Sequence, residues 1–305
     1  MNAGMPIISV VIPSYNHAHL IDRAVASVLA QDWSHLDIII VDNHSSDNTD
    51  EVVASFGDPR IRLLKVHNEG VIAVSRNLGI RAAKGEWVAF LDSDDWWSFD
   101  KLIRCAKHFD EADLIYHRLR IVTSGQSHFW PRHIRSWQVT KPVLQHMLIN
   151  GNPVATSSVV VRRSFLEKVG GFDERTEIVA AEDFDTWLRI ASLTDRFCFI
   201  QANLGYYFFS MQSASRKDMS LPMREVHAAH SHHLSSQEIG RMDTHAAYAS
   251  GIYSWRKNDI ARARSELTKC LRWGRADIRI KSIVVLLVML LSNTIIKSFS
   301  GSGER

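Results

Sequence analysis

Four short apolar runs alternate with helix-like patterns over the first hundred residues, and this alternation constrains the fold more than any other feature. The runs are Ile7–Ile12, Asp37–Val41, Ile61–Val66 and Trp87–Leu91. Between them, apolar residues recur at helical spacing over Leu20–Leu29, Asn48–Phe56 and Val71–Ala83. Near-continuous apolar strands joined by helices are typical of a parallel sheet with both faces covered. We therefore expect a β-α-β-α-β-α-β unit.

The middle of the chain carries weaker signals, and its last part carries only helical ones. Apolar runs predict strands at Leu114–His117 and Ser157–Val161, and periodicity predicts helices at Val143–Ile149, Ser164–Val169 and Glu182–Ser192. Beyond Leu221 we expect helices at Met223–Ser235, Thr244–Trp255, Asp259–Trp273 and Asp277–Ile296. The expected fold class is α/β, a mainly parallel sheet flanked by helices, with a C-terminal helical appendage.

Charge and composition exclude several classes of protein. The 305 residues include 36 Lys and Arg against 33 Asp and Glu, a surplus too small to suggest a nucleic-acid binder. The three cysteines lack metal-site spacing and fit a reducing cytosol. No secretory signal is recognisable. The longest apolar run, Ile283–Leu291, is shorter than the roughly 20 residues of a spanning helix. We expect a cytoplasmic location.

Polar residues follow the first two expected strands at their carboxyl ends, where open α/β sheets bind ligands. The first strand is followed by Pro13-Ser14-Tyr15-Asn16, and the second by Asp42 and the stretch Asn43–Thr49. For Ser45–Asn48 we favour a helix-capping role. Asp42 is different, because a carboxylate that directly follows four apolar strand residues needs a partner.

The fourth expected strand ends in Leu91-Asp92-Ser93-Asp94-Asp95-Trp96-Trp97. Side chains at i and i+2 of an extended segment share a face, so Asp92 and Asp94 can converge on one cation. Oxygen ligands suit Mg²⁺ or Mn²⁺. The alternative is an acidic turn that caps a helix. For the two tryptophans, stacking on a sugar and packing in the core are equally open.

Two further residues have a chemical and a structural interpretation. Arg76, within a predicted helix, could grip a phosphate or could be an ordinary exposed arginine. Asp183 lies with Glu182 in the first turn of a predicted amphipathic helix. The helix dipole alone favours acids there, but a carboxylate that faces a cleft is also suited to act as a general base.

The ordered motifs PSYN, VDNHSSDNT, NEGVIAVSRNLGI, FLDSDD, GGFDE and AEDFDTWLR resemble those of family 2 inverting glycosyltransferases of the GT-A fold, from about Pro6 to Ser215. The resemblance implies a catalytic GT-A domain over residues 1–215 and a helical region over 216–305. It also implies a hexosyltransferase that moves a sugar from a nucleotide-sugar donor, usually a UDP-sugar, to a hydroxyl group in polysaccharide or cell envelope biosynthesis.

The resemblance also implies roles for single residues. Asp183 would be the catalytic base of a single in-line displacement, and Asp94 would bind the divalent cation, Mg²⁺ or Mn²⁺. The nucleotide-sugar-binding residues would be Pro13, Tyr15, Asn16, Asp42, Arg76, Asp92 and Ser93. For the acceptor we consider Trp96, Trp97 and Glu182. The sequence departs from the family pattern at Asn43, where a second acid is common, and at Ser210, where a histidine is common.

The sequence also bears on three alternative functions. A sugar nucleotidyltransferase would need a glycine-rich basic loop after the first strand, and a nicotinamide dehydrogenase would need GxGxxG; neither is present. A non-catalytic module that binds nucleotide-sugars stays open.

The acceptor is suggested only by the C-terminal region. Residues 251–305 hold eleven Lys and Arg against four acids, together with the apolar run Ile283–Ile296. Such a segment suits the interface of an anionic membrane, which predicts a lipid-linked glycan acceptor at the inner face of the cell membrane. The alternative is that this helix packs on the catalytic domain and its charges are solvated.

Overall fold

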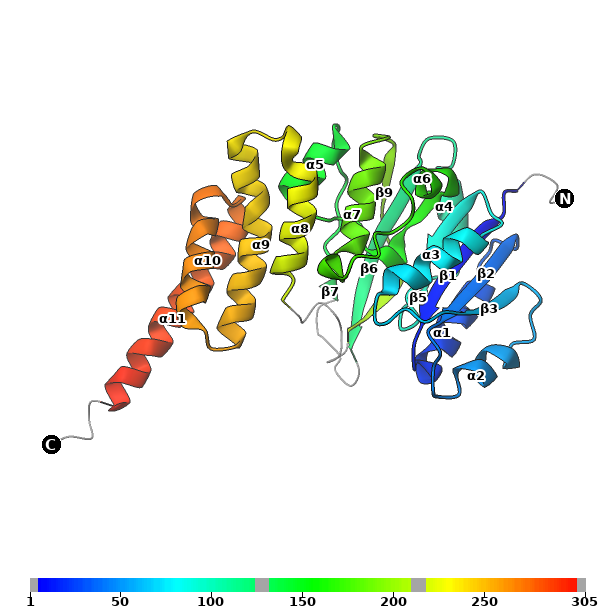
Figure 1. Cartoon of the computed structure of the whole chain (residues 1–305), viewed down its shortest axis with the longest axis horizontal. Coiled ribbons are helices and arrows are strands. Elements are labelled where there is room, and N and C mark those ends of the chain that lie inside the picture. Colours follow the sequence, from blue (N-terminus) through cyan, green and yellow to red (C-terminus); the bar gives the residue numbers. More distant parts are fainter. Residues whose placement is uncertain (1–4, 124–131, 210–217, 301–305) are drawn as a thin grey trace. The chain divides into compact units, whose positions relative to one another are not determined.

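The computed structural model describes residues 5–123, 132–209 and 218–300, with residues 292–300 and His233 described by backbone alone (Figure 1). The chain forms two compact units, each considered by itself. Unit 1 comprises Met1–Met147 and Asn152–Ser213, and unit 2 comprises Leu148–Gly151 and Ala214–Arg305.

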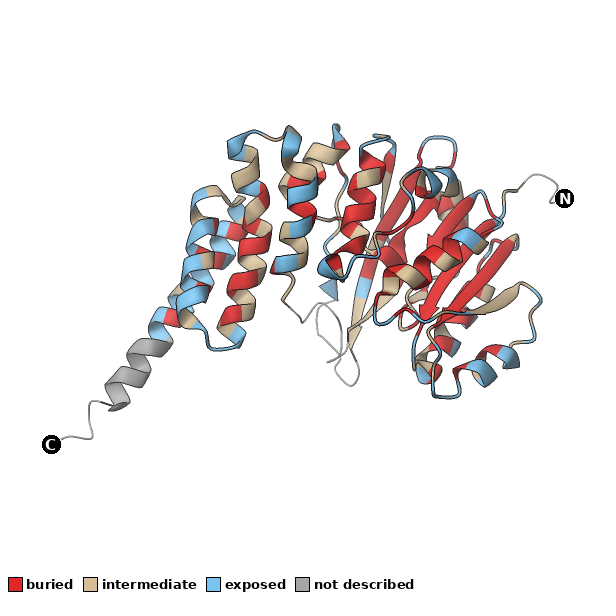
Figure 2. Cartoon of the chain, in the orientation of Figure 1, coloured by how far each residue is buried: buried red, intermediate tan, exposed pale blue. Residues whose placement is uncertain are grey.

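Unit 1 is built on one mixed sheet with the strand order β3-β2-β1-β4-β8-β6-β9-β5, and β7 pairs with β6. The parallel strands are those that the sequence predicts: β1 (Ile8–Ser14), β2 (Leu36–Asp42), β3 (Ile61–Lys65) and β4 (Trp87–Phe90). Every residue of β1, β2 and β4 is buried (Figure 2), which explains their near-continuous apolar sequences.

The other half of the sheet is mixed, and the sequence predicted it less well. Its strands are β5 (Trp96–Trp97), β6 (Leu114–Thr123), β7 (Arg132–His133), β8 (Val160–Arg162) and β9 (Phe197–Phe209). The strand expected from Ser157 begins instead with a 3₁₀ turn at Thr156–Ser158. The apolar pattern did not predict β9, because Gln201, Asn203 and Gly205 interrupt it.

Helices cover the sheet at the places where periodicity predicted them. They are α1 (Ala18–Leu29), α2 (Thr49–Ser55), α3 (Ile72–Ala82), α5 (Val143–Asn150), α6 (Arg163–Lys168) and α7 (Glu182–Ala191). Two short helical elements, α4 (Lys101–Ala106) and a 3₁₀ turn at Thr176–Ile178, were not expected.

Unit 2 is helical. Its helices are α8 (Ser220–His230), α9 (Ser236–Arg256), α10 (Ile260–Trp273) and α11 (Ala276–Ser300), with a 3₁₀ turn at Ser231–His233. Ser235 and Glu238 form a capping box at the start of α9. A small core forms where Ala247 of α9, Cys270 of α10 and Ile278 of α11 meet. Within the described part of the chain, we find no helix that combines the length and apolarity of a membrane span.

Gly85 allows the segment before β4 to lie against β1. Its amide donates a hydrogen bond to Ser9 Oγ (2.9 Å), and a Cβ atom built on Gly85 would lie 2.4 Å from the carbonyl oxygen of Ile7 and 2.7 Å from the amide nitrogen of Ser9. Both are backbone atoms of the central strand and its approach, so neither can move aside cheaply.

We predict that Gly85→Ala lowers the free energy of unfolding by about 2 kcal/mol, because the added methyl group overpacks the backbone of β1. Urea denaturation followed by circular dichroism measures this change. Lys84→Ala, at the exposed neighbouring position, is the control and should change stability by less than about 0.5 kcal/mol. Equal stability of Gly85→Ala and wild type would contradict the proposed close approach.

Candidate active site

The polar residues after the parallel strands meet at one edge of the sheet. The register pairs Ser14 of β1 with Asp42 of β2, and Asp42 with Lys65 of β3. Asp42 is fully buried, accepts hydrogen bonds from the amide (2.9 Å) and hydroxyl of Ser45, and receives the Lys65 ammonium at 2.8 Å. Burial alone would raise the pKa of Asp42, but these partners outweigh it and hold the pKa below the usual value.

The sequence required a partner for Asp42 but did not identify Lys65. The available signal was the basic residue Lys65 at the end of β3, which can be related to Asp42 only once β3 is paired with β2.

The loops after β1 and β2 are locked together by short polar side chains. Asn16 has a positive φ of 52° and accepts a hydrogen bond from the Ser46 amide (2.8 Å). Asp47 accepts from the amides of Ala18 (2.9 Å) and Thr49 (3.2 Å), so one carboxylate caps both α1 and α2. Asp47 thus binds the first amide of each helix, although the N-cap positions themselves are His17 and Asn48.

The two expected donor-binding residues that precede Asn16 differ in accessibility. Pro13 is buried within β1, whereas Tyr15 is 55% exposed. Tyr15 therefore presents an aromatic ring at the sheet edge.

Arg76 of α3 joins two distant parts of the site. Its guanidinium donates to Asp92 at 2.9 Å, just beyond β4, and to Glu182 at 2.7 Å, at the start of α7. The side chain is only 4% exposed, so the interpretation of Arg76 as an exposed helix arginine is wrong. Burial alone would lower the pKa of this guanidinium, but Asp92 and Glu182 outweigh it and raise the pKa.

Asp183 lies beside this ion bridge in the first turn of α7 and keeps part of its surface exposed. One carboxylate oxygen accepts from the Phe184 amide (2.6 Å), and the other accepts from the Thr156 hydroxyl (3.1 Å) and the Asn152 amide group (3.5 Å). Burial and the neighbouring Glu182 raise the pKa of Asp183 to about 7, against the opposing effect of Arg76. A carboxylate with such a pKa is suited to accept a proton near neutral pH.

The turn after β4 concentrates negative charge. Burial and the Asp92 carboxylate raise the pKa of Asp94 to about 6. Asp95 is 1% exposed, and burial followed by Asp94 raises its pKa well above the usual value. One Asp95 oxygen accepts from the Phe208 amide (2.8 Å). Ser93 is buried, and its hydroxyl is 2.8 Å from His17 Nδ1.

This turn fits a divalent cation. Its donors are oxygens, and a cation at Asp94 would relieve the repulsion that raises the carboxyl pKa. The described residues contain no group of three or more His, Cys, Asp or Glu side chains that could hold a metal ion by themselves. Ser210, the position of the family's histidine, lies outside the described residues.

Both tryptophans after this turn make ring contacts within the protein. Trp97 is 3% exposed, and the Lys101 ammonium lies 3.3 Å from its ring centre. The ring of Trp96 has the Arg23 guanidinium at 3.6 Å and stacks on the Tyr206 ring at 4.9 Å. Packing therefore accounts for Trp97, and a part of Trp96 in acceptor binding stays a prediction.

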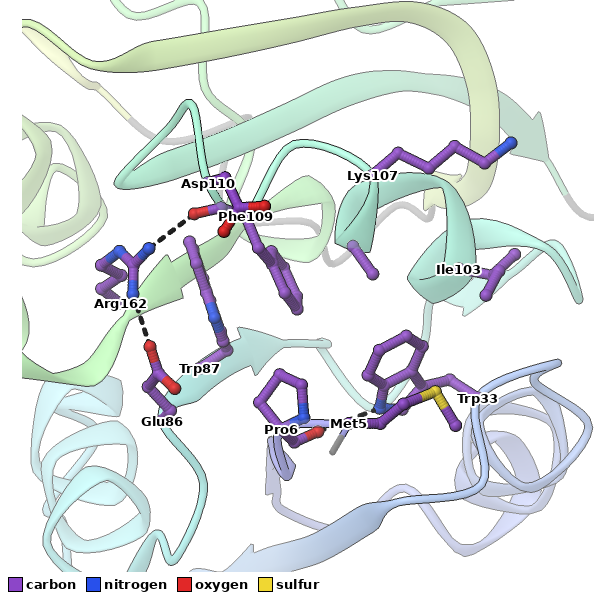
Figure 3. A pocket seen from close by; sticks show the side chains of 11 residues that line it. Met5, Pro6, Trp33, Glu86, Trp87, Ile103, Lys107, Phe109, Asp110 and Arg162 are labelled. Carbon is purple, nitrogen blue, oxygen red and sulfur yellow. Dashed lines mark hydrogen bonds and ion pairs between the residues drawn. The ribbon is translucent and has the colours of Figure 1, made fainter. Parts of the chain in front are cut away.

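A hollow of about 750 Å³ lies away from this site, near the amino ends of β1 and β4 (Figure 3). Met5, Trp33, Trp87 and Arg162 are among its lining residues. The Trp87 ring is stacked at 4.0 Å on Phe109 and covered by Arg162 at 4.5 Å. The Trp87 ring in its wall is therefore already paired with Phe109 and Arg162. The hollow also lies away from the carboxyl edge of the sheet, so it contributes nothing to the chemistry there.

The chain is similar in sequence to known glycosyltransferases. The family model described as glycosyl transferase family 2 matches residues 9–170, more than half of the chain. An uncharacterised glycosyltransferase of Nostoc is 34% identical over 174 residues, which cover 54% of each protein. The chain thus spans about half of that relative. It spans 38% of the Escherichia coli protein WfgD, named as a UDP-Glc:α-D-GlcNAc-diphosphoundecaprenol β-1,3-glucosyltransferase (41% identity, 32% of this chain).

Two solved structures share the fold. Residues 1–349 of Staphylococcus aureus TarS, in complex with UDP-GlcNAc, superpose with a TM-score of 0.63 at 17% identity, covering 90% of this chain and 83% of that one. The mannosyltransferase PcManGT of Pyrobaculum calidifontis, with GDP-Man and Mn²⁺, gives 0.60 at 18% identity, covering 94% and 81%. These likenesses confirm the expected α/β architecture of the GT-A type.

We predict that Glu182→Gln lowers the pKa of Asp183 by about one pH unit, because it removes the adjacent negative charge and frees Arg76 to act on Asp183. A ¹³C NMR titration of the aspartate carboxyls measures the change. Glu177→Gln, at an exposed position, should leave the titration of Asp183 unaltered. An Asp183 pKa that stays near 7 in Glu182→Gln would show that Glu182 does not control it.

Proposed function

Because the chain belongs to glycosyltransferase family 2, we propose that it transfers a sugar from a nucleotide-diphospho-sugar, foremost a UDP-sugar, to a hydroxyl group of a glycan acceptor with inversion at the anomeric carbon. One observation carries the proposal: the buried Arg76 bridge joins the acidic turn after β4 to the helix that presents Asp183. A proton acceptor and a cation-binding turn are thereby held at the same edge of the sheet.

In the proposed reaction, Asp183 accepts the proton of the acceptor hydroxyl as that oxygen bonds to the anomeric carbon. The bond from the anomeric carbon to the diphosphate oxygen breaks on the opposite face, and the nucleoside diphosphate leaves with the bonding electrons. Asp94 would hold a divalent cation, Mg²⁺ or Mn²⁺, whose charge would stabilise the leaving diphosphate. Tyr15, Asn16, Asp42 and the other donor-binding residues expected from the sequence would position the nucleotide.

The charge requirements favour catalysis over binding alone. A module that only bound a nucleotide-sugar would not need a half-buried carboxylate with a pKa of about 7 beside the ion bridge. A nucleotidyltransferase is less favoured, because no glycine-rich loop follows β1.

We predict that Asp183→Asn lowers the turnover number for sugar transfer by 10²- to 10⁴-fold, because the general base is removed, and leaves the Kd for the donor within about threefold. Nucleotide release from a panel of UDP-, GDP- and dTDP-sugars and calorimetric donor binding measure the two effects. Asp173→Asn, a carboxylate paired with the exposed Arg175, is the matched control. Full turnover by Asp183→Asn would exclude this base, and donor binding without release by the wild type would favour the non-catalytic module.

We further propose a lipid-linked glycan acceptor, and hence a cytoplasmic enzyme that binds the inner face of the cell membrane. The WfgD relative is named for an acceptor of this kind. Unit 2 supports the proposal, because α11 has two apolar faces. Ile278, Ser282 and Met289 are buried on one face, against α9 and α10.

The opposite face of α11 is apolar and exposed. It contains Ile280, Ile283, Val284, Leu287 and Leu291, which are 45–63% exposed. Their spacing places them on one stripe of the helix. The exposed Arg279 and Lys281 adjoin Ile280 in sequence and point to opposite sides of this stripe. An apolar stripe bordered by cations suits the interface of an anionic bilayer.

We predict that replacing Ile283, Val284, Leu287 and Leu291 by serine weakens sedimentation with phosphatidylglycerol vesicles by more than tenfold, because each side chain contributes apolar burial in the interface. Phosphatidylcholine vesicles test the role of charge. The same four-serine variant should still release nucleotide from the donor, which separates membrane binding from catalysis. Unchanged sedimentation would reject membrane binding by this stripe.

A further inference from the structure

Three side chains at four-residue spacing hold the backbone of residues 94–102. Arg23 and Ser27 lie one above the other on one stripe of α1, and Gln31 follows two residues beyond the end of that helix. Ser27 and Gln31 hold the far part of the segment: the Trp97 amide donates to Ser27 Oγ at 3.1 Å, and Gln31 Nε2 donates to the Ser98 carbonyl at 2.7 Å.

Gln31 makes a second bond to the same segment. The side-chain oxygen of Gln31, Oε1, accepts from the Leu102 amide at 3.0 Å, and the residue is only 8% exposed. The hydrogen bonds of Ser27 and Gln31 end on backbone atoms of residues 97–102. They therefore fix the backbone path after β4 independently of the side chains of that segment.

Arg23 is the member of this stripe at the acidic turn. Its Nη2 donates to the carbonyl oxygen of Asp94 at 2.8 Å. Its guanidinium lies over Trp96, with Cζ 3.6 Å from the ring centre. The Tyr206 ring stacks on Trp96 at 4.9 Å. A planar guanidinium can stack and donate in fixed directions at once, whereas an ammonium cannot.

We propose that Arg23 is a positioning residue for the divalent cation at Asp94. The inference rests on the proposed function, because it assumes that Asp94 binds the cation. Holding the Asp94 carbonyl fixes the peptide plane next to the Asp94 Cα and therefore the direction in which the carboxylate leaves the backbone. Mg²⁺ and Mn²⁺ sites need ligand oxygens at narrowly defined positions, so this direction controls affinity.

Charge adds to the positioning effect. Asp92, Asp94 and Asp95 repel one another, and the positive charge of Arg23 lies at the same turn. Arg23 thereby stabilises the turn in the arrangement that binds a cation. Because it reaches the turn through a carbonyl, it does so without occupying a carboxylate oxygen that the cation needs.

The test is direct Mn²⁺ binding, measured by the electron paramagnetic resonance signal of free Mn²⁺ in the presence of UDP. Arg23→Met should raise the Kd for Mn²⁺ about tenfold, the lower end of the effect of lost outer partners at metal sites. Arg23→Lys, which keeps the charge but loses the planar stack, should raise it about threefold. Ser27→Ala, one turn along the same stripe, should lower the melting temperature and leave the Kd within twofold.

An unchanged Kd in a folded Arg23→Met variant overturns the proposal. If that variant does not fold, an unchanged Kd in Arg23→Lys overturns it instead. An equal rise of the Kd in Ser27→Ala also overturns it, since the effect would then be general loosening of the segment. Failure of the wild type itself to bind Mn²⁺ removes the cation site from the proposed function and this inference with it, and is recognised by the wild-type measurement alone.

Discussion

The site depends on one buried guanidinium. Arg76 has 4% of its surface exposed and binds two carboxylates that are separated from it by 16 and 106 positions in the sequence. A buried charge of this kind is stable only while its partners are present, and removing one partner of such a pair costs roughly 3–5 kcal/mol. The fold therefore cannot place β4 and α7 independently. The Arg76 guanidinium fixes the position of the acidic turn relative to the helix that carries Asp183.

The Arg76 bridge also gives the neighbouring acids different electrostatic environments. Asp92 and Glu182 are the partners of Arg76, whereas Asp183 and Asp94 have raised pKa values, and among the described residues no ion pair is formed by either of their carboxylates. Environment rather than residue type separates these roles. A carboxylate already paired with arginine is a poor proton acceptor, whereas one whose charge is disfavoured is ready to accept a proton or a metal ion.

The sequence predicted the parallel half of the sheet because three of its four strands, β1, β2 and β4, are buried along their whole length and are therefore largely apolar. It missed β9, where Gly205 and polar residues break the pattern, although this strand supplies the amide that binds Asp95. It identified Arg76 as a candidate but not its burial, since its partners are distant in sequence. Likewise, nothing local to Asp42 indicates Lys65, because only the pairing of β2 with β3 brings them together.

Helix α11 shows a different limit of sequence analysis. In a helix with a single apolar stripe, the sequence predicts which face is buried. Helix α11 is apolar on nearly all sides, so its periodicity cannot distinguish the packed face from the exposed one. The structure shows that both occur at once: Met289 is 2% exposed and Leu291 is 63% exposed. Packing within unit 2 therefore does not exhaust the apolar surface of this helix. Selection for stability alone would not require aliphatic residues on the second face, since polar side chains there would cost little and would reduce self-association. The aliphatic residues on this face, beside Arg279 and Lys281, support the proposed binding to an anionic bilayer.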